Sequence, residues 1–245
     1  IRLTGGEPLV RKDIVELVEA INKIEGIDEI YLTTNGILLE DKVHILKKAG
    51  LKGVNISLDS LKDEMFNKLT RLGELKKVLK SIDKCLEHGI NVKLNVVMIK
   101  GINEDEILDF VKLTLDKSMD VRFIELMPIG VGSKFKGVSN EEIKKIIKDN
   151  YNDTEEVMKN KNGGPATYIK LRDAKGKVGF ISAISNCFCE ECNRIRLTSE
   201  GFLKQCLHYN YGIDLKKLLR NGASEEEIIN AIEEYIFNKP EKHLF

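Results

Sequence analysis

The segment Asn91–Ile99 reads NVKLNVVMI and alternates apolar with polar side chains along its first half. Successive residues of a β-strand point to opposite faces of a sheet, so Lys93 and Asn95 share one face and the aliphatic residues between them share the other. The aliphatic face suits packing against helices, whereas the polar face carries a cation. This pattern predicts a strand with helices on one side and a polar interior on the other.

The first half of the chain repeats this strand pattern, with a helix after most of the strands. Apolar spacing typical of amphipathic helices follows most of the strand-like segments. The predicted strands are Ile1–Thr4, Glu29–Thr34, Gly53–Leu58, Asn91–Ile99 and Asp120–Leu126, and the predicted helices are Lys12–Ile24, Glu40–Ala49, Lys62–Leu69, Glu74–His88 and Asn103–Asp116. Repeated strand–helix units predict an α/β fold with a parallel sheet.

The polar faces of these strands decide between an open sheet and a barrel. They carry Arg2, Thr4 and Gly6, then Tyr31, Thr33 and Asn35, then Asn55, Ser57 and Asp59, and finally Arg122. A doubly wound sheet would be apolar on both faces. A barrel with a polar ligand inside would show one polar face, and burying cations without anionic partners would be very costly. We therefore predict an incomplete TIM-type βα barrel; the alternative is a polar interior that is hydrogen-bonded without any ligand.

Short motifs follow the strands at their carboxyl ends, where α/β folds place their active sites. They are GGEP at 5–8, TTNG at 33–36, SLDS at 57–60 and MPIG at 127–130. The paired glycines let the main chain approach a ligand closely, and Glu7 adds an acceptor for an amine.

The repeated strand–helix pattern ends at Gly130, where a Gly-, Ser- and Lys-rich loop begins. This change predicts two domains, residues 1–130 and 131–245. Ser139 and Glu142 form a capping box ahead of a helix that reaches about Lys148. Three antiparallel strands are then expected at Thr154–Met158, Thr167–Leu171 and Val178–Ile181, followed by a hairpin at Arg194–Thr198 and Phe202–Cys206. The chain ends with helices at Leu215–Leu219 and at Glu225–Phe237, the latter capped by Ser224.

The hairpin belongs to the segment Asn186–Leu207, NCFCEECNRIRLTSEGFLKQCL, which holds four of the five cysteines. Cys189 and Cys192 form a close pair, and Cys206 follows after thirteen residues. A close pair with a distant third cysteine is metal-ligand spacing. Arg194 and Arg196 lie two residues apart and point the same way on a strand, which suits an anionic ligand such as phosphate.

The residues alone leave the metal undecided. With His208 as a fourth ligand the three cysteines would make a closed structural zinc site. Without a fourth ligand they would leave one iron of an iron–sulfur cluster open to a substrate. Cys187 could be a spare thiol or a competing ligand, and Cys85, on an apolar helix face, is predicted to be a buried core residue.

Composition excludes other classes. Lys+Arg and Asp+Glu both number 39, so the net charge is zero and a general nucleic-acid binder is not expected. No apolar run reaches the roughly 20 residues of a membrane span, and no signal peptide is seen. Clustered cysteines indicate intracellular metal chemistry rather than a disulfide framework.

Several of these motifs together resemble the radical S-adenosylmethionine superfamily and, within it, the GTP 3′,8-cyclase family of molybdenum cofactor biosynthesis (the MoaA family). The stretches LTGGEPLVR, TTNG, ISLDS, KLNVVMIKG, RFIELMPIG and FCEECNRIRLTSEGFLKQC occur in that family's order and spacing. GGEP alone indicates the superfamily, whereas the cysteine segment narrows the resemblance to this family. A different radical S-adenosylmethionine enzyme and a non-catalytic, zinc-stabilised nucleotide-binding protein are the alternatives.

The resemblance implies a role for each matching position. Contacts to S-adenosylmethionine are implied for Gly5, Gly6, Glu7, Ser57 and Met127. Contacts to GTP are implied for Arg2, Thr4, Thr33, Lys93, Arg122, Arg194, Ile195 and Arg196. Cys189, Cys192 and Cys206 are implied as ligands of an auxiliary 4Fe–4S cluster whose open iron holds the guanine.

The resemblance also implies the reaction and its setting. A second 4Fe–4S cluster cleaves S-adenosylmethionine to a radical that takes the ribose 3′ hydrogen of GTP, and the resulting carbon radical attacks guanine C8. The product is (8S)-3′,8-cyclo-7,8-dihydroguanosine 5′-triphosphate. An electron donor and cyclic pyranopterin monophosphate synthase are the implied partners, a homodimer is compatible with the family, and the expected location is cytoplasmic.

Two departures from the family pattern are visible. The C-x3-C-x2-C motif that holds the second cluster lies before GGEP in the family, so we expect the motif and the first barrel strand upstream of Ile1, and we expect the given chain alone to be inactive. The family usually ends in a Gly-Gly tail, whereas this chain ends KPEKHLF.

Overall fold

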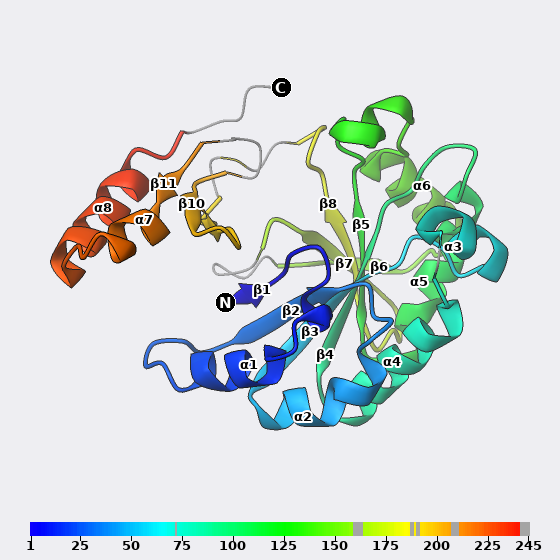
Figure 1. Cartoon of the computed structure of the whole chain (residues 1–245). Coiled ribbons are helices and arrows are strands. Elements are labelled where there is room, and N and C mark those ends of the chain that lie inside the picture. Colours follow the sequence, from blue (N-terminus) through cyan, green and yellow to red (C-terminus); the bar gives the residue numbers. More distant parts are fainter. Residues whose placement is uncertain (72, 159–163, 187–188, 190–191, 207–210, 241–245) are drawn as a thin grey trace. The chain divides into compact units, whose positions relative to one another are not determined.

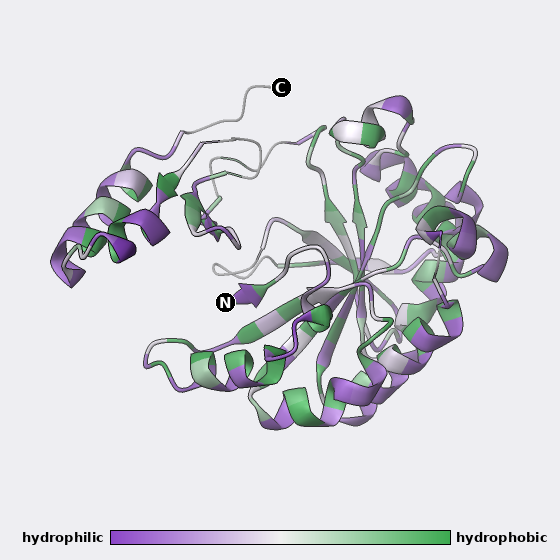
Figure 2. Ribbon diagram, viewed as in Figure 1, coloured by the Kyte–Doolittle hydropathy of each residue, from purple (hydrophilic) through white to green (hydrophobic). Residues whose placement is uncertain are grey.

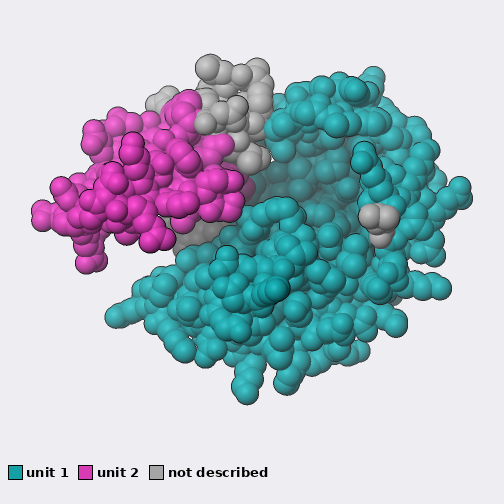
Figure 3. All heavy atoms as spheres, in the orientation of Figure 1, with its two compact units in different colours: residues 1–186 teal, residues 187–245 magenta. Residues whose placement is uncertain are grey.

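The computed structural model describes residues 1–71, 73–158, 164–186, 189, 192–206 and 211–240. The chain forms two compact units, Ile1–Asn186 and Cys187–Phe245 (Figure 3). Each is described by itself. Within the described residues, no helix is long and apolar enough to cross a membrane.

Unit 1 is built on one eight-stranded sheet with the order β1-β2-β3-β4-β5-β8-β7-β6 (Figure 1). Strands β1 to β5 and β8 pair in parallel, whereas β7 and β6 run antiparallel at one edge. The strands are β1 Arg2–Leu3, β2 Ile30–Thr34, β3 Leu51–Ser57, β4 Asn91–Val96, β5 Asp120–Ile124, β6 Thr154–Val157, β7 Thr167–Leu171 and β8 Val178–Ile181.

Helices connect the parallel strands and lie along the outside of the sheet (Figure 1). They are α1 Ile14–Asn22, α2 Val43–Lys48, α3 Asp63–Thr70, α4 Leu75–Glu87, α5 Ile107–Asp116 and α6 Asn140–Asn150. Short 3-10 turns at Pro8–Val10, Glu40–Lys42, Glu104–Glu106 and Gly130–Lys134 complete the connections. The predicted α/β fold of partial-barrel type is confirmed, with strand and helix ends shifted by a few residues.

One apolar layer holds the helices on the sheet. Leu32, Ile56, Leu94 and Phe123, one from each of four neighbouring strands, are fully buried together with residues of the helices such as Val78. Fully burying one such side chain stabilises the fold by about 1.5–3 kcal/mol. Figure 2 shows hydrophobic and hydrophilic residues alternating along the covering helices, as expected for amphipathic helices.

Three strands that follow residue 130 extend the sheet of unit 1. Strand β8 pairs in parallel with β5, so the three strands from Thr154 to Ile181 belong to the same sheet as the βα repeats. The structure thus divides at residue 186. The predicted division of the sequence at residue 130 stays a prediction.

The described residues of unit 2 form a three-stranded antiparallel sheet with two helices. The order is β11-β10-β9, with β9 Arg196–Leu197, β10 Phe202–Lys204 and β11 Ile213–Asp214. Helix α7 spans Leu215–Arg220 and α8 spans Glu225–Phe237. The predicted hairpin is present but shorter, and the predicted capping of α8 by Ser224 is confirmed as a full capping box with Glu227.

Candidate active site

The inner face of the unit 1 sheet is polar, and strand register brings its side chains into rows. Thr33 pairs with Asn55, and Asn55 pairs with Lys93 on β4. One row further along, Asn95 pairs with Arg122 on β5. Residues in register on neighbouring parallel strands point to the same side, so these positions form a continuous polar surface. Figure 3 shows that unit 1 is hollowed at its centre.

A chain of hydrogen bonds crosses this face. Arg122, only 7% exposed, donates from Nη2 to Oδ1 of Asn55. The Asn55 amide nitrogen lies 3.4 Å from Oγ1 of Thr33. A buried guanidinium is costly unless it is hydrogen-bonded, so these contacts hold Arg122 in a fixed orientation. Thr33 and Arg122, both predicted as GTP contacts, are therefore linked through Asn55, which sequence reasoning placed on this face without a role.

Lys93 is the second cation of the inner face. Its Nζ lies 3.7 Å from Oδ2 of Asp120 and 5.8 Å from the ring centroid of Tyr168. Burial lowers the pKa of Lys93, Asp120 raises it in part, and the nearby cations Arg122 and Arg2 lower it again. Since one carboxylate faces several cations, an anionic ligand would restore the electrostatic balance.

Tyr168 on β7 completes this cationic region, although sequence reasoning missed it. It pairs with Gly179 on β8, which in turn pairs with Arg122 on β5. Burial raises the pKa of the Tyr168 phenol, and the charge of Arg122 only partly offsets this. The alternation of strand 167–171 could have signalled Tyr168, but only the pairing of β8 with β5 brings that strand beside the βα repeats.

The GGEP loop is tied to the neighbouring strand by Glu7. Its Oε1 accepts hydrogen bonds from Leu9 N at 3.0 Å and from Thr34 Oγ1 at 2.8 Å, and its Oε2 accepts one from Asn35 N at 2.8 Å. We expected the Glu7 carboxylate to accept a hydrogen bond from a ligand amine. In this structure its main contacts fix the loop after β1 to the loop after β2, so Glu7 positions the two glycines before it.

Those glycines present open main chain. A Cβ built on Gly5 or Gly6 would meet no heavy atom within 4 Å, and Gly5 has a φ of +150°, which side chains rarely allow. Ser57, at the carboxyl end of β3, is exposed, and Met127 is half-buried. An open backbone loop fits the amino-acid part of a cofactor such as S-adenosylmethionine.

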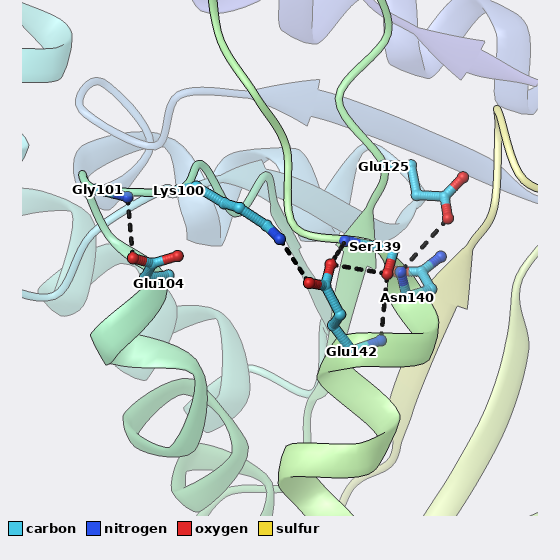
Figure 4. A network of polar contacts seen from close by, with 7 residues as sticks. All are labelled: Lys100, Gly101, Glu104, Glu125, Ser139, Asn140 and Glu142. Atoms are coloured by element: carbon cyan, nitrogen blue, oxygen red, sulfur yellow. Dashed lines mark hydrogen bonds and ion pairs between the residues drawn. The ribbon is translucent and has the colours of Figure 1, made fainter.

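Hydrogen bonds also brace the loops after β4 and β5 (Figure 4). The Glu142 carboxylate accepts hydrogen bonds from Lys100 Nζ at 2.5 Å and from the main-chain N–H and hydroxyl of Ser139. These hydrogen bonds, of which that from Lys100 has the largest effect, lower the pKa of Glu142 to about 2. The predicted capping box at Ser139 is therefore confirmed, with Lys100 as an addition.

Glu125 is the second brace. This carboxylate, 5% exposed, accepts hydrogen bonds from Ser185 Oγ and N, from Ile184 N and from Asn140 N. Burial would raise the pKa of Glu125, but these hydrogen bonds outweigh burial and lower it. Glu125 thus joins the end of β5, the start of α6 and the segment after β8.

In unit 2 the cysteine pair forms one turn. The main-chain N–H of Cys192 donates to the carbonyl of Cys189 at 3.0 Å, and both thiols are half-buried and free of disulfides. Burial raises the pKa of the Cys192 thiol, but the main chain at Arg194 and the charge of Lys239 outweigh burial and lower it. The Lys239 ammonium donates to the carbonyls of Cys192 and Arg194.

The three predicted cluster ligands are not assembled in this structure. Among the described residues, no group of three or more His, Cys, Asp or Glu side chains is arranged to hold a metal ion. Cys206 is a half-buried free thiol beyond β10. Cysteine thiolates are the usual ligands of iron–sulfur clusters, and the Cys192 thiol lies near the cations Lys239 and Arg194. The ligand set itself stays a prediction. Cys187 and His208 lie outside the described residues.

Comparison with known proteins defines the class first. Residues 1–114 match the family model of the radical SAM superfamily. SuiB of Streptococcus suis, solved with S-adenosylmethionine bound, has a TM-score of 0.60 at 16% identity and covers 93% of this chain and 54% of its own. A domain of pyruvate-formate lyase-activating enzyme from Bacteroides vulgatus has a TM-score of 0.50 at 17% identity, over 60% of this chain and 90% of its own. The fold is therefore that of the radical SAM superfamily, as the GGEP motif predicted.

The particular family follows from closer relatives. Residues 119–245 match the model named Molybdenum Cofactor Synthesis C. GTP 3′,8-cyclase of Clostridium perfringens is 57% identical over 100% of this chain and 76% of its own length. The enzyme of the same name from Alkaliphilus oremlandii is 49% identical over 99% of this chain and 75% of its own. The chain belongs to the GTP 3′,8-cyclase family, which confirms the predicted resemblance. Radical SAM membership implies a 4Fe–4S cluster and S-adenosylmethionine as cofactors.

Proposed function

We propose that this protein is a radical GTP 3′,8-cyclase, a lyase that forms (8S)-3′,8-cyclo-7,8-dihydroguanosine 5′-triphosphate in the first step of molybdenum cofactor biosynthesis. The observation that carries the proposal is the cationic inner face of unit 1. Lys93 and Arg122 are held there at a cost in solvation, with Asp120 as the carboxylate paired to Lys93. A triphosphate is an anion that would offset this cost.

The residues of the chain divide into those for substrate and those for cofactor. We assign GTP binding to Arg2, Thr4, Thr33, Lys93 and Arg122 of unit 1, with Arg194, Ile195 and Arg196 of unit 2 as further contacts. Guanidinium groups can hold two phosphate oxygens at once, whereas Lys93 acts as a point charge. Asn55 keeps Arg122 and Thr33 oriented before the substrate arrives, which lowers the cost of binding.

S-adenosylmethionine is assigned to the open loop of Gly5 and Gly6, with Ser57 and Met127 as further contacts. The carboxylate of Glu7 fixes this loop to the loop after β2. When bound, S-adenosylmethionine and a reduced 4Fe–4S cluster supply the radical chemistry. The contribution of these protein residues is to hold the reactants in one geometry and to exclude water.

Cys189, Cys192 and Cys206 are assigned to an auxiliary 4Fe–4S cluster. Three thiolates leave one iron open, which could orient the guanine base. We further propose a cytoplasmic location, an electron donor for the clusters, and cyclic pyranopterin monophosphate synthase as the enzyme that takes over the product.

Anaerobic iron and sulfide analysis tests the cluster assignment. We expect iron and acid-labile sulfide in reconstituted protein, with thiolate absorbance at about 400 nm, and loss of the auxiliary iron on Cys206→Ser. Stoichiometric zinc without iron would overturn the assignment and favour a zinc-stabilised nucleotide-binding protein.

A pair of lysine variants tests the substrate assignment. Lys93→Met should weaken GTP binding and leave S-adenosylmethionine binding unchanged, because it removes a cation from the inner face only. Lys52→Met, at an exposed position of β3, is the matched control. Arg196→Ala, with the exposed Arg220→Ala as its control, should behave in the same way. Equal loss of both ligands would count against a role in triphosphate binding.

A further inference from the structure

Tyr168 occupies the cationic part of the inner face without an assigned role. It reaches this position because β7 pairs with β8 and β8 pairs with β5. Gly179 on β8 pairs with Tyr168 of β7 on one side and with Arg122 of β5 on the other. The tyrosine therefore extends the polar surface beyond the parallel βα repeats, over a strand that runs antiparallel to them.

Gly179 makes the contact between these two side chains possible. A Cβ at position 179 would lie 2.7 Å from Cε1 of Tyr168 and 2.9 Å from Cγ of Arg122. Both distances are shorter than real Cβ contacts, so any side chain would push the ring and the guanidinium stem apart. The absence of a side chain at Gly179 thus leaves room for Tyr168 to lie against Arg122.

In its hydrogen bond with Arg122, the Tyr168 hydroxyl is the acceptor, so its own O–H remains available as a donor. A guanidinium group has donors only, so in the hydrogen bond between Arg122 and Tyr168 the phenol oxygen is the acceptor. The phenol O–H can then donate to a third group. Burial raises the pKa of this phenol, so the proton stays on the oxygen at neutral pH.

The charges around Tyr168 indicate which kind of group would accept a hydrogen bond from its O–H. Lys93 Nζ lies 5.8 Å from the Tyr168 ring centroid, and the charge of Arg2 also acts on Tyr168. Cations on several sides favour an anionic oxygen over a neutral one. Asp120 is already paired with Lys93 at 3.7 Å.

We infer that Tyr168 is a further substrate-binding residue, which donates its phenol hydrogen bond to a phosphate oxygen of GTP between Lys93 and Arg122. The inference rests on the proposed function and adds a specific contact to it. It also gives Gly179 a reason to lack a side chain.

The test compares Tyr168→Phe with Tyr151→Phe in the reconstituted protein. Both variants remove one hydroxyl group, but Tyr151 lies half-buried against the core at the end of α6. Isothermal titration with GTP, and separately with inorganic triphosphate, should show about tenfold weaker binding of both by Tyr168→Phe, the loss of one hydrogen bond to a charged acceptor. Tyr151→Phe should match the wild type, and S-adenosylmethionine affinity should be unchanged in both.

Gly179→Ala provides a second variant, because its Cβ displaces Tyr168 and Arg122 together. It should weaken GTP binding more than Tyr168→Phe does. If the wild type binds GTP and Tyr168→Phe binds it equally well, the inference is wrong while the proposed function stands. Equal weakening of GTP and S-adenosylmethionine binding would also overturn it, since that indicates a general structural role. A wild-type protein that does not bind GTP overturns the proposed function itself.

Discussion

Lys239 and Arg194 are joined by a hydrogen bond of 3.0 Å from the lysine Nζ to the arginine main-chain carbonyl, across 45 residues of sequence. The same ammonium donates to the carbonyl of Cys192. In the same unit, the amide of Gln205 donates to the carbonyl of Tyr235 on α8. The C-terminal helix and the residues that follow it therefore hold the main chain on both sides of the cysteine hairpin in unit 2.

Lys239→Met should loosen the turn between Cys192 and Arg194. The variant keeps the aliphatic stem but removes both hydrogen bonds, each made by a charged donor. In reconstituted protein we expect roughly tenfold faster release of iron to a chelator, because a tenfold change corresponds to the loss of about one hydrogen bond made by a charged donor. Lys217→Met, an exposed lysine on α7, is the control. Equal release rates for Lys239→Met and the wild type would show that these two hydrogen bonds of Lys239 do not support the proposed metal site.

Glu125→Gln should destabilise unit 1 by about 1–3 kcal/mol at neutral pH, because the amide NH2 would face main-chain N–H donors that the carboxylate now accepts. The folded-state pKa of Glu125 lies below its ordinary value of 4.5, so this carboxylate stabilises the fold above that pH and ceases to do so as the pH falls through the lowered pKa. Urea unfolding of both proteins across pH should show a gap that is constant at neutral pH and narrows below 4.5. A gap that widens toward acid would contradict this account.

Glu7→Gln should weaken S-adenosylmethionine binding and leave GTP binding nearly unchanged. Both carboxylate oxygens of Glu7 accept hydrogen bonds, and an amide can replace only one of them, which frees the loop of Gly5 and Gly6 from the strand beside it. The expected loss is on the order of tenfold. Glu16→Gln, at an exposed position of α1, serves as the control. An unaltered cofactor affinity would mean that the loop keeps its shape without this anchor.

Cys85 should resist alkylation until the protein unfolds. It is fully buried on α4, and burial raises the pKa of its thiol to about 12. At pH 8 the reactive thiolate would then be about 1 part in 10,000. Iodoacetamide treatment of native, metal-free protein followed by peptide mass spectrometry should find Cys85 unmodified and the half-buried Cys189, Cys192 and Cys206 modified. Labelling of Cys85 at the rate of those three would show that α4 opens locally.

Local patterns predicted the elements well, because their causes lie within a few residues. The capping boxes at Ser139 and Ser224 depend on a glutamate three residues on, and both are present. Strands β7 and β8 and helix α8 have the predicted bounds, since alternation or helical spacing and turn signals define them. The polar faces of β2 to β5 also followed from alternation alone, and with them the partial barrel.

The side-chain partnerships could not be predicted, because each depends on strand pairing between distant segments. The place of Tyr168 beside Arg122 requires β8 to join β5 in parallel. The anchoring of Glu7 requires the loops after β1 and β2 to meet, 27 residues apart. Sequence reasoning predicted a ligand contact for Glu7, which stays a prediction, but it could not foresee this anchoring, and it gave Tyr168 no role.

By itself the sequence determined the class of this protein, since alternation, GGEP and the cysteine spacing are properties of short segments. Only the tertiary structure decided which residues stabilise one another: Arg122 through Asn55, the GGEP loop through Glu7 and the cysteine turn through Lys239. The physical reason is that a hydrogen bond or a buried charge depends on distance in space, and distance in space between remote residues is set by the packing of the whole sheet.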